Sequence, residues 1–177
     1  VASVNMDLLG GGMHAQLART LRTERGLTYA AMSRFSKSTL PFWMVWTFGG
    51  VEQTKGLLTG VPEVVGKYVA APLTAKDLTE SQGRLLNSNG TELELAQDRL
   101  LTQSWFYANG LNPEAVEQYS KSVGKTKLAE VTKFKNILSS KAAAIYVMGD
   151  QTKLIPILES IGVPRAEIRV VKMAEIL

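Results

Sequence analysis

Residues 8–29, LLGGGMHAQLARTLRTERGLTY, carry the strongest structural signal in this chain. Apolar residues recur every three or four positions, which is the spacing of one helix face; they are Met6, Leu9, Met13, Leu17 and Leu21. Each of the three consecutive glycines at positions 10–12 should weaken a helix by about 1 kcal/mol relative to alanine. We therefore predict one helix from Met6 to Leu21, which keeps its glycines because it packs closely against another backbone.

The end of this stretch predicts a helix-to-strand turn. Gly26 suits the position just after a helix, where a left-handed backbone is needed, and a strand is expected over residues 27–35. Arg22 then falls in the last helical turn and Tyr29 in the strand. Two interpretations stay open: Arg22 simply complements the helix dipole while Tyr29 fills a strand position, or both side chains act on a ligand.

The rest of the pattern predicts an α+β fold with helices covering an antiparallel or mixed sheet. Residues 42–48 (FWMVWTF) are almost continuously apolar, which is typical of a strand covered on both faces. Helical spacing follows over residues 52–70, and Thr74 with Asp77 resembles a capping box opening the next helix. The remaining expectations are helices on both sides of Gly90, after Asn112-Pro113, from about Thr126 and over 154–161, with strands over 142–148 and 168–171.

Length and composition indicate one ordinary globular unit. The 177 residues suffice for a single hydrophobic core, so we expect one α+β domain over residues 1–177. The net charge of +4 is spread over helical segments, which does not favour a nucleic-acid surface. The chain has no cysteine, which excludes disulfides and thiolate chemistry and leaves the compartment open. No apolar run approaches a membrane span.

Several site motifs fail on inspection. The only histidine is His14, and the position four residues on, where a metal-binding partner would lie, is Ala18. We therefore expect no metal site, and no bound cofactor, within this chain. Residues 123–126 (VGKT) resemble the end of a phosphate-binding loop, but Tyr119 stands where that motif needs glycine. The aromatic run at 42–48 could line a small-molecule pocket, although such a run is more often core.

The first segment resembles the C-terminal-type repeat of the pitrilysin/insulinase-like zinc metallopeptidases, a family that includes the mitochondrial processing peptidases. The similar residues are Leu9-Gly10-Gly11, Leu21-Arg22 and Gly26-Leu27-Thr28-Tyr29, and a more diffuse likeness continues to residues 147–150 (VMGD). The resemblance implies two homologous αβ domains facing each other across a chamber. One carries the inverted zinc motif His-x-x-Glu-His, and the other supplies an arginine and a tyrosine that hold the substrate and stabilise the oxyanion.

Carried over by position, the catalytic pair implied by the resemblance is Arg22 and Tyr29. The sequence departs from the family pattern in two ways: His-x-x-Glu-His is absent, and the leading strand or strands before the first helix are missing. We therefore expect a fragment of a longer peptidase, or of a partner subunit in a heterodimer, inactive alone. Zinc would lie in the partner domain or subunit, and the substrate would be an unfolded peptide bound along a sheet edge.

Two alternatives belong to other classes. The chain could be a catalytically inactive homologue that acts as a scaffold subunit in a complex, or a small-molecule binding domain that uses the aromatic strand. No nucleic acid or membrane span is expected as a partner, and the expected location is the periplasm or cytoplasm of a bacterium.

Overall fold

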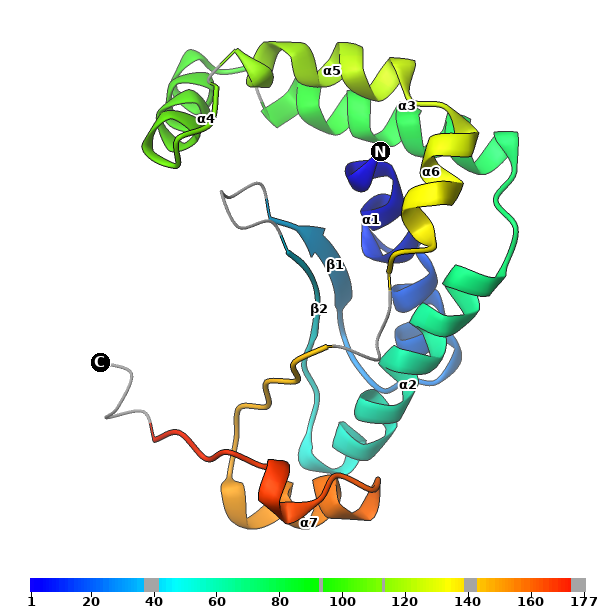
Figure 1. Ribbon diagram of the computed structural model, residues 1–177, viewed down its shortest axis with the longest axis vertical. Helices are drawn as coiled ribbons and strands as arrows, with labels where there is room; N and C mark the ends of the chain where they lie inside the picture. Colours follow the sequence, from blue (N-terminus) through cyan, green and yellow to red (C-terminus); the bar gives the residue numbers. More distant parts are fainter. Residues whose placement is uncertain (37–41, 93, 113, 139–142, 173–177) are drawn as a thin grey trace.

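The computed structural model describes residues 1–36, 42–92, 94–112, 114–138 and 143–172. It is an α+β fold in which helices surround a small antiparallel hairpin, as predicted (Figure 1). The elements in chain order are α1 (Ala2–Gly10), the π-helix η1 (Ala18–Glu24), β1 (Ala31–Phe35), β2 (Trp43–Thr47), α2 (Val51–Ala70), α3 (Ala75–Glu92), α4 (Ala96–Ala108), α5 (Ala115–Lys125), α6 (Leu128–Lys135), α7 (Gln151–Ser160) and the 3-10 turn η2 (Arg165–Glu167).

The helices form an arc around one side of the hairpin. In Figure 1, α1 packs against β1, with α2 and α6 on the same side, while α3 and α5 run together across the top and α7 lies near the start of α2. The C-terminal segment passes on the opposite side of the hairpin. The core lies between the hairpin and this arc of helices.

The predicted helix from Met6 to Leu21 is wrong in one respect, because α1 ends at Gly10 and the chain resumes a helix only at Gln16. The predicted close packing is confirmed. A Cβ on Gly10 would lie 2.4 Å from the Ser33 nitrogen and 2.9 Å from the Met32 carbonyl carbon. The next two glycines leave the helix rather than continue it, because a helical glycine without packing compensation is unfavourable.

The hairpin turns one face to the helices. Its register pairs Ala31 with Thr47 and Phe35 with Trp43, so alternate residues share a face. The inward residues join a core that includes Met6, Leu9, Leu17, Leu21, Val64, Val65, Tyr68 and Leu138. The prediction that residues 42–48 are covered on both faces is wrong for the chain as it stands, because Met44 and Trp46 point outward and are exposed.

A buried polar hub ties α1 to α2 and α6. The Tyr68 hydroxyl donates to Asn5 Oδ1 at 2.7 Å, and Asn5 Nδ2 donates to the Val131 carbonyl at 3.2 Å. Burial raises the pKa of Tyr68 above its usual value. A satisfied buried network of this kind fixes helix positions because every alternative packing would orphan a polar atom.

The predicted helix start signals are mostly confirmed. Asp77 Oδ2 accepts from the Thr74 nitrogen at 2.8 Å, and Thr74 Oγ1 accepts from the Asp77 nitrogen at 3.2 Å, which is the expected capping box. Asn112 is the expected N-cap of the next helix, but α5 begins at Ala115 with Glu114 at its N-cap, while Asn112 Oδ1 accepts from the Glu114 nitrogen. Pro113 lies outside the described residues. Gly90 does not interrupt α3, which runs on to Glu92.

The two C-terminal strand predictions are wrong. Residue 142 lies outside the described part of the chain, but residues 143–148 form no ladder, and Tyr146 and Met148 are 93% and 90% exposed. Residues 168–171 likewise have no strand structure. Apolar β-branched runs become strands only when another strand satisfies their backbone groups, and neither segment pairs with a described strand.

Candidate functional site

The end of η1 sets the geometry of the candidate site. The Arg25 nitrogen donates to the Thr20 carbonyl at 3.1 Å, an i→i−5 bond that widens the helix by one residue at this turn. The chain then closes with a bond from the Leu27 nitrogen to the Leu21 carbonyl at 2.8 Å. Gly26 has φ of 62°, so its predicted role as the left-handed residue after the helix is confirmed.

This turn brings Arg22 and Tyr29 together on the surface. The Arg22 guanidinium carbon lies 4.5 Å from the centre of the Tyr29 ring, a cation–π contact. Arg22 Nη1 also donates to the Met13 sulfur. Tyr29 is 71% exposed, so its hydroxyl is open to a ligand. The two side chains that the sequence singled out are therefore neighbours, while their chemical role stays a prediction.

A hydroxyl network holds the backbone beside Tyr29. Thr28 is buried, and its Oγ1 lies 2.6 Å from the Phe48 carbonyl oxygen and 3.1 Å from Thr47 Oγ1. Thr47 Oγ1 donates to the Ala30 carbonyl at 2.9 Å. The residues on both sides of Tyr29 are thus fixed to the end of β2, which restricts where the phenol ring can lie.

A charged cluster ties the η1 end to α2. Glu63 Oε1 accepts from Arg25 Nη2 at 2.7 Å and from Lys67 Nζ at 2.7 Å. The hydrogen bond from Arg25, followed by that from Lys67, lowers the pKa of Glu63 to about 2. These groups are solvent-exposed, so the cluster orients the turn more than it stabilises the fold.

His14 belongs to a different group of charged side chains from the Arg22–Tyr29 pair. Its Nε2 is 3.6 Å from Asp7 Oδ1, and Asp7 is only 6% exposed. Arg84 Nη2 and Nε donate to Asp7 Oδ2 at 2.8 and 3.1 Å. The buried Asp7 carboxylate is therefore paired with the Arg84 guanidinium, which supplies the counter-charge that a buried acid needs.

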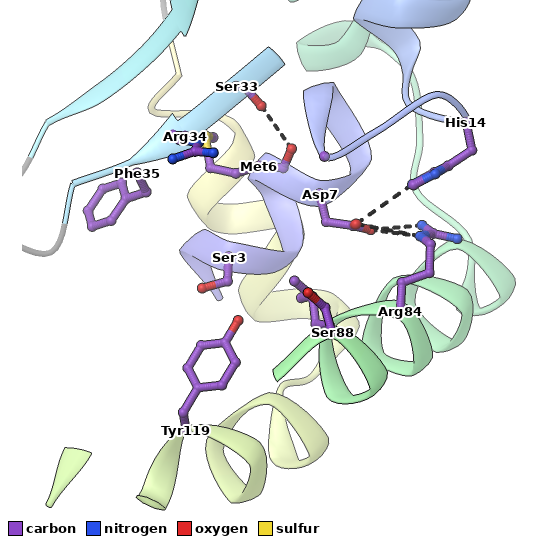
Figure 2. Close-up of a pocket in the computed structure, with 12 residues that line it drawn as sticks. Ser3, Met6, Asp7, His14, Ser33, Arg34, Phe35, Arg84, Ser88 and Tyr119 are labelled. Carbon is purple, nitrogen blue, oxygen red and sulfur yellow. Dashed lines mark hydrogen bonds and ion pairs between the residues drawn. The ribbon is translucent and has the colours of Figure 1, made fainter. Parts of the chain in front are cut away.

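These three residues line a pocket of about 310 Å³ between α1, β1, α3 and α5 (Figure 2). In Figure 2, Ser3 and Tyr119 lie at one end of the pocket, and Asp7, His14 and Arg84 lie at the other. Neither Arg22 nor Tyr29 lines it. Phe35 of β1 lines the pocket, but the aromatic side chains of residues 42–48 do not. The pocket therefore does not match the small-molecule site considered for those residues.

Sequence reasoning missed the Asp7–Arg84 pair and the pocket it borders. The two residues are 77 positions apart, and neither belongs to a recognisable motif. The one available signal was an acid inside an apolar helix, since Asp7 follows Met6 and precedes Leu8. A buried acid of this kind requires a cationic partner somewhere in the fold.

Among the described residues, no group of three or more histidine, cysteine, aspartate or glutamate side chains is placed to hold a metal ion. None of the described helices is long and apolar enough to cross a membrane.

Comparison with known proteins finds a family similarity in the N-terminal part of the chain. Residues 1–85 match the family model described as the peptidase M16 inactive domain. No curated protein matches the sequence significantly.

Solved structures share the fold. The structure of a peptidase M16 inactive domain from Pseudomonas fluorescens aligns with a TM-score of 0.62 at 23% identity, over 76% of this chain and 32% of that one. A putative zinc protease from Bordetella pertussis Tohama I aligns with a TM-score of 0.59 at 12% identity, over 75% of this chain and 73% of that one. The periplasmic protease PqqL from Escherichia coli gives 0.54 at 20% identity, over 75% and 15%.

The chain thus spans about a third of the Pseudomonas structure and a smaller part of PqqL. The family model and the shared fold agree with the resemblance carried by the Leu-Gly-Gly and Gly-Leu-Thr-Tyr segments. Residues 1–85 of this chain are thus similar to the peptidase M16 inactive domain, and the chain shares the fold of solved members of that group.

Proposed function

We propose that this chain is the substrate-binding and oxyanion-stabilising domain of a zinc metalloendopeptidase that acts on unfolded peptides. The observation that carries the proposal is the contact between Arg22 and Tyr29, 4.5 Å apart on an exposed turn of a domain whose described residues contain no metal-ligand cluster. Zinc would belong to another domain of the same polypeptide or to a partner subunit. The setting would be the periplasm or cytoplasm of a bacterium.

The two side chains have the chemistry that the task requires. The Arg22 guanidinium offers several donors to peptide carbonyl oxygens, and beside its bond from Nη1 to the Met13 sulfur it has further N–H groups for them. The Tyr29 hydroxyl donates a hydrogen bond to the carbonyl oxygen as negative charge develops there. The attacking water would be activated by zinc bound in the other domain.

A peptide bound in an extended conformation along an edge of the hairpin would meet this pair. Main-chain hydrogen bonds of such an added strand tolerate varied side chains. Tyr29 precedes β1 by two residues, and Thr28 and Thr47 fix that junction. The arrangement therefore favours a site that recognises backbone more than sequence.

The test is a pair of substitutions in the whole parent protein. Tyr29→Phe keeps the ring under Arg22 and removes only the hydroxyl, so kcat should fall by about 10²–10³ with little change in KM. Arg22→Lys keeps the charge but loses the fork of donors, so it should raise KM as well. Tyr107→Phe is the matched control, because Tyr107 is an exposed tyrosine on α4, away from η1.

If Tyr29→Phe stays within about twofold of the parent in turnover, the oxyanion role is wrong. A second function is favoured by the description of the matching family model as an inactive domain. In that case the parent serves as a scaffold subunit, has no peptidase activity, and both variants assemble into its complex as the parent does. Measuring peptide cleavage and complex assembly on the same preparations separates the two proposals.

A further inference from the structure

The thioether of Met13 lies against the candidate site. Met13 is on the turn between the end of α1 and the helix that resumes at Gln16, and its side chain is 58% exposed. Its sulfur accepts a hydrogen bond from Arg22 Nη1. The same guanidinium lies 4.5 Å from the centre of the Tyr29 ring. Arg22 is therefore in contact with a sulfur atom and with an aromatic ring at once.

The turn fixes where the Met13 side chain begins. The Ala15 nitrogen donates to the Gly12 carbonyl at 3.1 Å, and the Gly11 nitrogen donates to the Asp7 carbonyl at 2.9 Å, so backbone bonds hold the chain on both sides of Met13. Ala15 is also buried in the fold. The methionine side chain has three rotatable bonds, so its sulfur end can reorient while the backbone stays beside η1.

An exposed thioether is open to oxidation by peroxides. A sulfur lone pair attacks the terminal oxygen of the peroxide, an S–O bond forms and the O–O bond breaks. The thioether is oxidised by two electrons to a sulfoxide, and the departing oxygen keeps a proton and leaves as water or an alcohol. Met13 has the exposure that this reaction needs, whereas the sulfur-bearing side chain of Met6 lies in the core at 4% exposed.

Oxidation would change what Arg22 is bonded to. A thioether sulfur is a weak acceptor, whereas a sulfoxide is polar and presents an oxygen. Hydrogen bonds from an ionised donor to oxygen are roughly twice as strong as neutral ones. Because the Met13 sulfur already receives an Arg22 N–H, rotation about the side-chain bonds brings the new oxygen to the same donors. The guanidinium would then be held more firmly than it is by the thioether.

We propose that Met13 is an oxidation site whose sulfoxide captures the Arg22 guanidinium. The modification is reversible, because methionine sulfoxide reductases return the sulfoxide to the thioether. The capture is a contact between two side chains of this chain and does not depend on a peptidase role. Its effect on activity rests on the proposed function: captured donors are lost to the peptide, so turnover falls.

The experiment treats the parent protein with dilute hydrogen peroxide and maps the oxidised residues by mass spectrometry. Met13 should gain one oxygen atom faster than the buried Met6. Phenylglyoxal, which labels guanidinium groups, then measures how available Arg22 is. Labelling of Arg22 should slow several-fold after oxidation, and a methionine sulfoxide reductase should restore the original rate. Arg99, an exposed arginine on α4, is the internal reference and should label at an unchanged rate.

Met13→Leu separates this site from oxidation elsewhere. Leucine is apolar and of similar size but has no sulfur, so peroxide should no longer change the labelling of Arg22. Met148→Leu is the matched control, because Met148 is 90% exposed and Arg22 should respond in this variant as in the parent. The inference is overturned if Met13 oxidises no faster than Met6, if oxidation does not slow the labelling of Arg22, or if the slowing persists in Met13→Leu.

Peptide cleavage by the same preparations separates this inference from the proposed function. If both hold, peroxide lowers the turnover of the parent and of Met148→Leu but not that of Met13→Leu. Slower labelling of Arg22 with unchanged turnover would support the capture and refute a role of Arg22 in cleavage. Lower turnover without slower labelling would refute the capture.

Discussion

The backbones of α1 and β1 lie close together at Gly10, and Gly10→Ala tests this packing directly. The added Cβ would meet the Ser33 nitrogen at 2.4 Å and the Met32 carbonyl carbon at 2.9 Å. Both are backbone atoms, so no side chain can swing aside to relieve the contact. The matched control is Gly66→Ala on the exposed side of α2, where an added Cβ meets nothing within 4 Å.

The two substitutions should have opposite signs. Restoring an ordinary contact of about 3.4 Å at Gly10 requires α1 to retreat by roughly 1 Å, and overpacking of this kind lowers the free energy of unfolding by about 1–3 kcal/mol. Alanine returns at most ~1 kcal/mol of helix propensity, so a net loss of about 1–2 kcal/mol is expected. Gly66→Ala should raise the free energy of unfolding by about 0.5–1 kcal/mol.

Urea unfolding followed by circular dichroism measures both changes. For a chain of this length, Tm moves by about 2–4 °C per kcal/mol, so Gly10→Ala should melt about 2–8 °C below the parent and Gly66→Ala slightly above it. A Gly10→Ala protein as stable as the parent, alongside a stabilised Gly66→Ala, would mean that α1 does not lie against β1 at this distance. The argument for the glycine would then fail.

Three further substitutions probe the charges and the buried hub. Asp7→Asn should lower the free energy of unfolding by about 1–3 kcal/mol in urea titrations, because Arg84 loses its bidentate partner; an unchanged value would contradict the pairing. Burial raises the pKa of Tyr68 above 10, so as pH rises the unfolded chain loses the phenol proton before the folded chain does. The free energy of unfolding should therefore fall as pH rises above 10. Tyr68→Phe should flatten this decrease, whereas Tyr107→Phe at an exposed position should not. The pKa of Glu63 is lowered to about 2, so the stability that its ionised carboxylate contributes is present above pH 4.5 and is lost as pH falls toward 2. In Glu63→Gln, the free energy of unfolding should lack this decrease at acid pH. A decrease equal to that of the parent would be evidence against the pairing.

The features that sequence predicted are local in the chain. The Thr74–Asp77 capping box, the left-handed Gly26 and the helix beginning near residue 52 each depend on residues within one or two turns of one another. Arg22 and Tyr29 meet for the same reason, since only the turn at Gly26 separates them. Short-range spacing is enough to specify such features.

The features that sequence did not predict depend on distant partners. The close packing of Gly10 depends on β1, and the Asp7–Arg84 and Asn5–Tyr68 contacts join different helices. The strand expected over residues 142–148 is an error of another kind, because here the sequence predicted an element that residues 143–148 do not form. Its apolar pattern is a sound strand signal, but a strand forms only when a neighbour supplies the backbone hydrogen bonds, and no sequence window reports whether that neighbour is present.

The contact of Arg22 with Tyr29 adds a physical reason for their working as a unit under the proposed function. The attraction between the cation and the ring face holds the two side chains next to each other. Under the proposed function, the phenol and the guanidinium would then present their donors to the same peptide. The unit needs both positions to be fixed, and different parts of the fold fix them: the buried Leu21 and the π-turn hold Arg22, and the Thr28–Thr47 network holds Tyr29. Removing the Thr47 hydroxyl should therefore let the Tyr29 ring move and lower turnover under the proposed function, while the contacts of Arg22 stay in place.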